Sequence, residues 1–142
     1  MAMAIQKLEG IQNELLTRFP ELQEGLERAF GSYYNLKSEI PDPYPVFGVV
    51  LRPLVFDLLR TERDKPLLRR IFAFLEEMAL SPDSNVTDLL GIEVIEDLVL
   101  DRASIQRAWN YMGEKTKEFA RETARYGGWQ DNLPPDEPSA HT

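Results

Sequence analysis

The sequence contains no cysteine and only one histidine, His141, among its 142 residues. Without cysteine, disulfides, thiol nucleophiles and zinc sites built on thiolates are excluded. His141 is the second-last residue, so we expect a solvated side chain in a chain end and no base for a catalytic serine. The absence of cysteine also fits a reducing cytoplasm, which is the localisation that we predict.

Long apolar runs are also missing. The longest apolar stretch, residues 46–51, is far shorter than the roughly 20 residues that cross a bilayer. The N-terminus, MAMAIQKLEGIQ, lacks the apolar core of a signal peptide. No glycine-rich phosphate loop precedes a predicted helix, since Gly127 and Gly128 follow one. The sequence therefore predicts no membrane partner and no cofactor.

Basic residues are in the minority, with 16 Lys and Arg against 24 Asp and Glu, and the formal net charge is −8. Binding to nucleic acid depends on clustered basic side chains, so we predict no nucleic-acid partner and favour a basic protein. The imbalance is confined to residues 71–101, which carry 8 acids and no base. The remaining 16 acids equal the 16 bases in number, so this one segment accounts for the whole net charge.

Apolar residues recur at helical spacing, and prolines and glycines divide the chain into short segments. They predict helices over residues 3–18, 21–30, 46–62, 66–80, 85–100, 102–112 and 114–126. No segment alternates as a strand would. We predict an all-α fold, a compact irregular bundle of about six to seven short helices, with HEAT-like antiparallel pairs as an alternative. Residues 1–126 form a single helical domain, and residues 127–142 form a proline-rich C-terminal tail.

Proline modifies this pattern at two places. Three prolines in SYYNLKSEIPDPYP predict one long loop before the third helix. Pro53 lies inside that helix, so it marks either a kink or a restart. Tyr33, Tyr34 and Tyr44 flank the proline loop, where they serve either as interface aromatics or as a lid over the core.

The acidic segment forms the most distinctive pattern. On a helical wheel of residues 85–100, one arc is apolar and the opposite arc carries Glu93, Glu96 and Asp97. Leu89 falls inside the acidic arc, and Gly91 falls on the apolar arc, where it indicates close approach of another helix. We predict a partner surface with an apolar anchor and a charged rim, composed of Glu76, Glu77, Leu89, Glu93, Glu96 and Asp97. The competing interpretation is that Leu89 packs on a neighbouring helix and the acids are only solvated.

Pairs of carboxylates are also compatible with an enzymatic function. Glu76 with Glu77, or Glu93 with Glu96 and Asp97, provide oxygens for Mg²⁺ or for acid–base catalysis. Acids at these spacings are common on solvated helix faces, so a catalytic or metal-binding role is the weaker hypothesis. We therefore predict a protein that is not an enzyme and has no catalytic or metal-binding residue.

Three segments carry a resemblance: LLRRIFAFLEEMA, LLGIEVIEDL and YMGEKTKEF, preceded by IPDPYPVFGVVLRPLV. From about residue 19 to residue 123, the chain resembles an immunity-like family of small all-helical bacterial proteins associated with polymorphic toxin systems. The resemblance implies a cytoplasmic, non-enzymatic protein that binds and neutralises a cognate toxin domain. A scaffold or adaptor with no toxin partner is the alternative.

Overall fold

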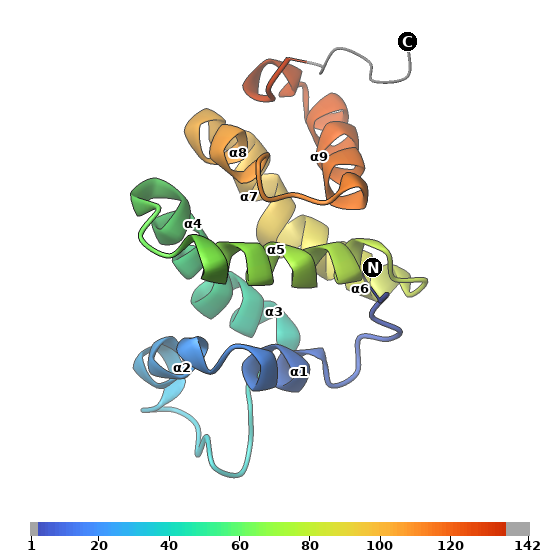
Figure 1. The fold of residues 1–142 in the computed structure, drawn as a ribbon. Helices are drawn as coiled ribbons and strands as arrows, with labels where there is room; N and C mark the ends of the chain where they lie inside the picture. Colours follow the sequence, from blue (N-terminus) through green and yellow to red (C-terminus); the bar gives the residue numbers. More distant parts are fainter. Residues whose placement is uncertain (1–2, 136–142) are drawn as a thin grey trace.

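A computed structural model describes residues 3–135 and shows helices but no strand within that range. The all-α prediction is confirmed, because seven stretches that contain α-helix, with the short 3-10 turn η4, form one compact bundle in the described residues (Figure 1). Two of these stretches combine α-helical and π-helical segments. The elements are α1 (Ile11–Arg18), η1 (Pro20–Leu22), α2 (Gln23–Phe30), α3 (Pro43–Pro45), η2 (Val46–Leu51), α4 (Arg52–Thr61), α5 (Lys65–Ala79), α6 (Ser84–Leu90), η3 (Gly91–Ile95), α7 (Glu96–Leu100), α8 (Arg102–Ala108), α9 (Glu114–Gly127) and η4 (Gln130–Asn132).

Two long helices lie at the centre of the bundle. Helix α5 crosses the middle of Figure 1, and the continuous helix α6–η3–α7 lies behind it. Helices α1 and α2 lie on one side of this pair and α8 and α9 on the other (Figure 1). The central helices supply fully buried core residues, including Phe72, Leu75, Val94 and Leu98. Burial of such apolar side chains is the main stabilising contribution to folding.

The two central π turns, η2 and η3, contact each other, and each contains a buried glycine. A Cβ atom on Gly48 would lie 2.3 Å from a carboxylate oxygen of Glu93. A Cβ atom on Gly91 would lie 3.2 Å from the Phe119 ring of α9. The prediction that Gly91 permits close helix approach is therefore confirmed.

Pro53 does not interrupt its helix, which runs continuously through α3, η2 and α4. The irregularity precedes it, because the π turn η2 ends two residues before Pro53. A proline has no amide hydrogen to bond to the preceding helical turn, and π turns are one of the recognised irregularities in helices.

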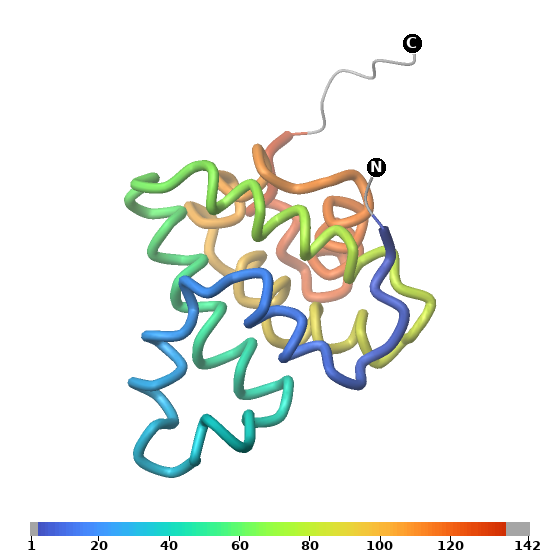
Figure 2. The backbone as a smooth tube through the Cα atoms, turned by 60° about the horizontal axis from the view of Figure 1, so that its bottom comes forward, coloured from blue at the N-terminus to red at the C-terminus, as the bar shows by residue number. Residues whose placement is uncertain are grey.

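The first predicted helix begins later than its apolar spacing indicates. Residues 3–7 have no regular structure, and Gly10 has a left-handed φ of 80° immediately before α1. The N-terminal segment is held against other elements, since the Ile5 amide donates to the Glu77 carbonyl and the Leu8 amide donates to Asp83, both at 3.0 Å. Figure 2 shows this segment running beside the α5–α6 connection.

The other end of the described chain also packs on the bundle. Helix α9 ends at Gly127, and Gly128 adopts a left-handed φ of 79°. The chain then turns back, and the Asn132 side chain donates to the Val99 carbonyl at 2.9 Å while the Gln106 amide donates to the Asn132 carbonyl at 3.1 Å. Part of the predicted tail is thus attached to the bundle, whereas His141 lies outside the described residues.

Candidate partner-binding surface

Glu76 has a structural role in place of the surface role predicted for it. Its carboxylate lies at the N-terminus of α9 and accepts hydrogen bonds from the Lys115 amide at 3.0 Å and the Thr116 amide at 2.8 Å. The Thr116 hydroxyl donates a third bond at 2.7 Å. A carboxylate at this position satisfies amides that have no partner within the helix and complements the helix dipole. Glu76 therefore holds α5 to α9.

Glu77 is likewise used within the fold. Its carboxylate accepts a hydrogen bond of 2.6 Å from Arg18 of α1, and its side chain is only 14% exposed. This hydrogen bond is the largest cause of a raised pKa at Arg18, whose guanidinium also lies 5.0 Å from the centre of the Phe74 ring. Glu77 therefore joins α5 to α1, and its role on a partner surface stays a prediction.

Leu89 is 0% exposed, so its predicted position at the centre of the partner surface is wrong. Its helix contacts elements on several sides, including α5, η2, α8 and α9. Ile92, which a regular helical wheel places within the apolar arc, is 51% exposed.

Asp97 and Glu93 remain near the surface but are tied to the neighbouring helix. The Arg52 guanidinium lies 2.9 Å from the Asp97 carboxylate and donates to the Glu93 carbonyl at 3.0 Å. The Glu93 carboxylate lies against Gly48. A positive charge therefore accompanies this part of the predicted acidic surface.

The three predicted tyrosines lie on the α2–α3 loop and on α3. Tyr33 is 83% exposed, and Tyr34 and Tyr44 are each 37% exposed. Tyr34 packs edge-to-face on Phe30, with ring centroids 5.8 Å apart. The loop from α2 to α3 lies at the bottom of Figure 1, whereas α9 lies near the top. None of the three tyrosines lines the pockets described below, and their role as interface aromatics stays a prediction.

A groove of about 540 Å³ lies between the α6–η3–α7 helix and α9. Its apolar and aromatic lining is formed by Gly91, Ile92, Phe119, Tyr126 and Trp129. Three carboxylates also line it, from Asp88, Glu96 and Glu122. We call this site the acidic groove; its remaining lining residues are Thr87, Thr123 and Gly127.

The charge of the acidic groove is not compensated locally. None of its lining residues is basic, and none of Asp88, Glu96 and Glu122 forms an ion pair with another residue of the described chain. Three like charges around one concave apolar surface create a local negative potential.

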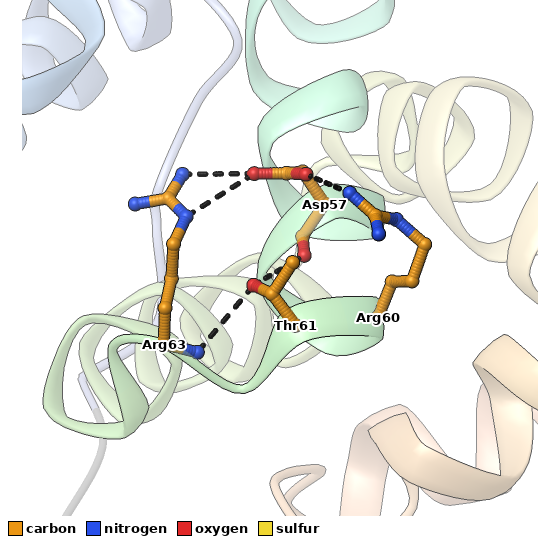
Figure 3. Close-up of polar contacts among 4 residues, drawn as sticks. All are labelled: Asp57, Arg60, Thr61 and Arg63. Atoms are coloured by element: carbon orange, nitrogen blue, oxygen red, sulfur yellow. Dashed lines mark hydrogen bonds and ion pairs between the residues drawn. The ribbon is translucent and has the colours of Figure 1, made fainter.

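Asp57 on α4, in contrast, is an acid whose charge is paired with basic side chains. Arg63 donates to its carboxylate at 2.9 and 3.2 Å, and Arg60 donates at 2.7 Å (Figure 3). The hydrogen bonds from Arg63 and then Arg60 are the largest causes of a lowered pKa at Asp57. Asp57 is thus paired with two arginines, whereas the three carboxylates of the acidic groove form no ion pair within the described residues.

Of the residues predicted for the partner surface, only Glu96 lines this groove. A regular wheel of residues 85–100 places Asp88 away from Glu93, Glu96 and Asp97. A usable signal was present in the sequence, because Asp88, Ile92 and Glu96 are spaced four apart, as are Glu118, Glu122 and Tyr126. Residues four apart share a helix face, and all six except Glu118 line the groove.

Two geometric findings bear on the remaining predictions. Across residues 3–135, no three Asp, Glu or His side chains lie close enough together to hold a metal ion. Over the same range, every helix is too short or too polar to traverse a lipid bilayer.

The fold and the groove define an all-α bundle with an acid-lined surface site. A family model described as a domain of unknown function, DUF7674, matches residues 13–127, and the chain belongs to this family. The matched range includes α5 to α9 and most of the acidic groove. Neither the curated proteins nor the solved structures contain a match.

Proposed function

We propose that this protein is a non-enzymatic binding domain whose acidic groove takes up a basic segment of a partner protein. The observation that carries the proposal is the uncompensated trio of Asp88, Glu96 and Glu122 around an apolar groove. Interfaces commonly combine an apolar anchor with a polar rim, and complementary charge accelerates encounter with the correct partner.

The groove suits a segment that presents an apolar side chain between Lys or Arg residues. The apolar side chain would contact Ile92, which is half exposed, and the ring of Trp129. The flanking ammonium or guanidinium groups would approach the carboxylates, where charge-assisted hydrogen bonds are stronger than neutral ones. Tyr126 is 97% exposed and offers an aromatic face to a cation.

We propose further that the partner is a toxin domain in the cytoplasm, which this protein neutralises by binding. The resemblance to immunity-like proteins supports this choice, and so does charge, because toxin domains that act on nucleic acids need basic surfaces. The negative charge of the acidic groove would attract a basic segment of such a toxin domain and cover it.

A second candidate is an adaptor that joins two partners. It is favoured by the exposed Tyr33 on the α2–α3 loop, at the opposite end of the bundle from α9 (Figure 1). An adaptor would use the tyrosine loop and the acidic groove at the same time, whereas a neutralising protein needs only a toxic partner.

Site-specific photocrosslinking in the native cells tests the first proposal. A benzophenone amino acid at position 92 samples the groove, and the same group at position 49 is a matched control, because Ile92 and Val49 are 51% and 52% exposed. We expect a protein with a basic segment to be captured from position 92 alone. Equal capture from both positions would contradict the proposal. Expression of the captured protein alone then distinguishes the candidates, since a toxin arrests growth and an adaptor's partner does not.

A further inference from the structure

A second concave surface lies on another side of α9. It has a volume of about 590 Å³ and is lined by Arg102 of α8 and by Arg121 and Arg125 of α9. We call it the arginine pocket; its other lining residues are Trp109, Gln130, Asp131, Leu133, Pro134 and Pro135. Arg121 and Arg125 are four residues apart, so they project from one helix face.

The guanidinium groups of the arginine pocket are held by interactions that leave their charge uncancelled. Arg102 donates to the carbonyl of Asp131 at 2.9 Å, and Arg121 lies 5.3 Å from the centre of the Trp109 ring. Within the described residues, Arg102, Arg121 and Arg125 form no ion pair with a carboxylate. Asp131 is the one acid in the lining, so the pocket is positive on a chain whose net charge is −8.

Neighbouring cations repel one another, and this repulsion falls when a bound anion lies between them. A guanidinium presents paired N–H donors that match the oxygens of phosphate or carboxylate. Three arginines around one pocket match the charge density of a phosphate or pyrophosphate better than that of a single carboxylate. The volume lies within the range of small-molecule sites, about 300–1,000 Å³.

We propose that the arginine pocket binds a small phosphate-bearing ligand, with Arg102, Arg121 and Arg125 contacting its oxygens. Leu133, Pro134 and Trp109 supply an apolar wall for an organic group attached to the phosphate. This site is independent of the acidic groove, and the proposal does not depend on the proposed partner. A small ligand also agrees with the overall negative charge, which disfavours the long phosphate backbone of a nucleic acid.

Isothermal titration calorimetry of the full chain with pyrophosphate tests the proposal at low ionic strength. We expect saturable binding, weakened at least tenfold by Arg121→Gln together with Arg125→Gln. The control is Arg28→Gln together with Arg69→Gln, which removes the same charge elsewhere and should leave the affinity unchanged within twofold. Arg125→Gln alone is a second test, since this exposed side chain forms no hydrogen bond, ion pair or ring contact with the described residues. Its substitution should therefore weaken pyrophosphate binding without changing the stability of the fold.

The proposal is overturned if pyrophosphate produces no binding heat, or if both double variants weaken binding equally. Citrate serves as a carboxylate probe, and affinity for citrate equal to or greater than that for pyrophosphate would overturn the assignment to phosphate. ADP distinguishes two sources of the same chemistry. Tighter binding of ADP than of pyrophosphate indicates a phosphate carried on an organic group, and equal affinity indicates that the inorganic anion is sufficient.

Discussion

Glu76 and Thr116, 40 residues apart in the chain, are joined by two hydrogen bonds to one carboxylate oxygen, Oε1. The Thr116 amide lies at 2.8 Å and its hydroxyl at 2.7 Å, and Thr116 is fully buried. With the bond from the Lys115 amide to Oε2, the carboxylate fixes the start of α9 against α5. Since α9 forms one wall of the acidic groove, Glu76 supports the groove without lining it.

Removal of the Glu76 carboxylate should therefore destabilise the fold. Glu76→Ala is expected to lower the free energy of unfolding by about 2 kcal/mol, because it leaves a buried hydroxyl and two helix-terminal amides without their acceptor. Urea unfolding followed by circular dichroism measures the change. Glu114→Ala is the matched control, since Glu114 is an exposed acid in the first turn of α9. A loss as small as that of the control would show that Glu76 is not a cap.

Gly113 should be coupled energetically to Glu76. A Cβ atom at position 113 would lie 2.4 Å from the Glu76 carboxyl carbon, although the φ of −74° is one that alanine adopts readily. Gly113→Ala should therefore displace the carboxylate and destabilise the wild-type protein by at least about 1 kcal/mol. In the Glu76→Ala background the same substitution should be neutral or stabilising, because alanine restricts the unfolded chain. Additive effects in a double-mutant cycle would refute the coupling.

Leu89 and Ile92 should respond differently to truncation, although both are apolar residues of the same continuous helix. Leu89→Ala is expected to lower the free energy of unfolding by about 2–5 kcal/mol, the range for large-to-small changes in a core. Ile92→Ala should cost less than about 1 kcal/mol, because half of the Ile92 side chain is exposed. Chemical denaturation of the two variants measures both values, and equal losses would be inconsistent with the positions described.

Asp57 should titrate below its ordinary pKa, because Arg63 and then Arg60 donate hydrogen bonds to its charged form. A lowered folded-state pKa stabilises the fold above the unfolded pKa, and this contribution disappears as the pH falls through the folded pKa. Carboxyl-carbon NMR titration measures the shift directly. Arg63→Gln should raise the pKa of Asp57 toward its ordinary value, whereas Arg69→Gln should not. If the pKa of Asp57 is unchanged in the Arg63→Gln variant, the hydrogen bonds from Arg63 are not the cause of the lowered pKa.

Helix type and most helix positions follow from sequence, because apolar spacing, proline and glycine are local signals. The pattern thus predicted the helix over residues 66–80, observed as α5, within one residue at each end. The apolar pattern did not predict the role of a residue whose contacts come from elements far away in the sequence. Nothing near Glu76 in the sequence indicates that it caps α9, and nothing near Leu89 indicates that its helix is enclosed by other elements.

The acidic groove was not predicted from the sequence for a related reason. Its two walls come from helices separated along the chain, and Ile92, which a regular wheel places within the apolar arc, lies at the surface. The acids of residues 71–101 serve in helix caps, in ion pairs and in the lining of the groove. Only tertiary contacts determine which carboxylates remain uncompensated.

The most direct test of the account is the affinity of the captured partner for a charge-reversed groove. Asp88→Lys, Glu96→Lys and Glu122→Lys are combined in one variant, and Glu27→Lys, Glu39→Lys and Glu62→Lys form a control with the same change in net charge. By surface plasmon resonance at low salt, the groove variant should lose at least about tenfold in association rate, as electrostatic steering requires, and the control should lose much less. Equal rates for the two variants would contradict the assignment of the acidic groove as the partner-binding site.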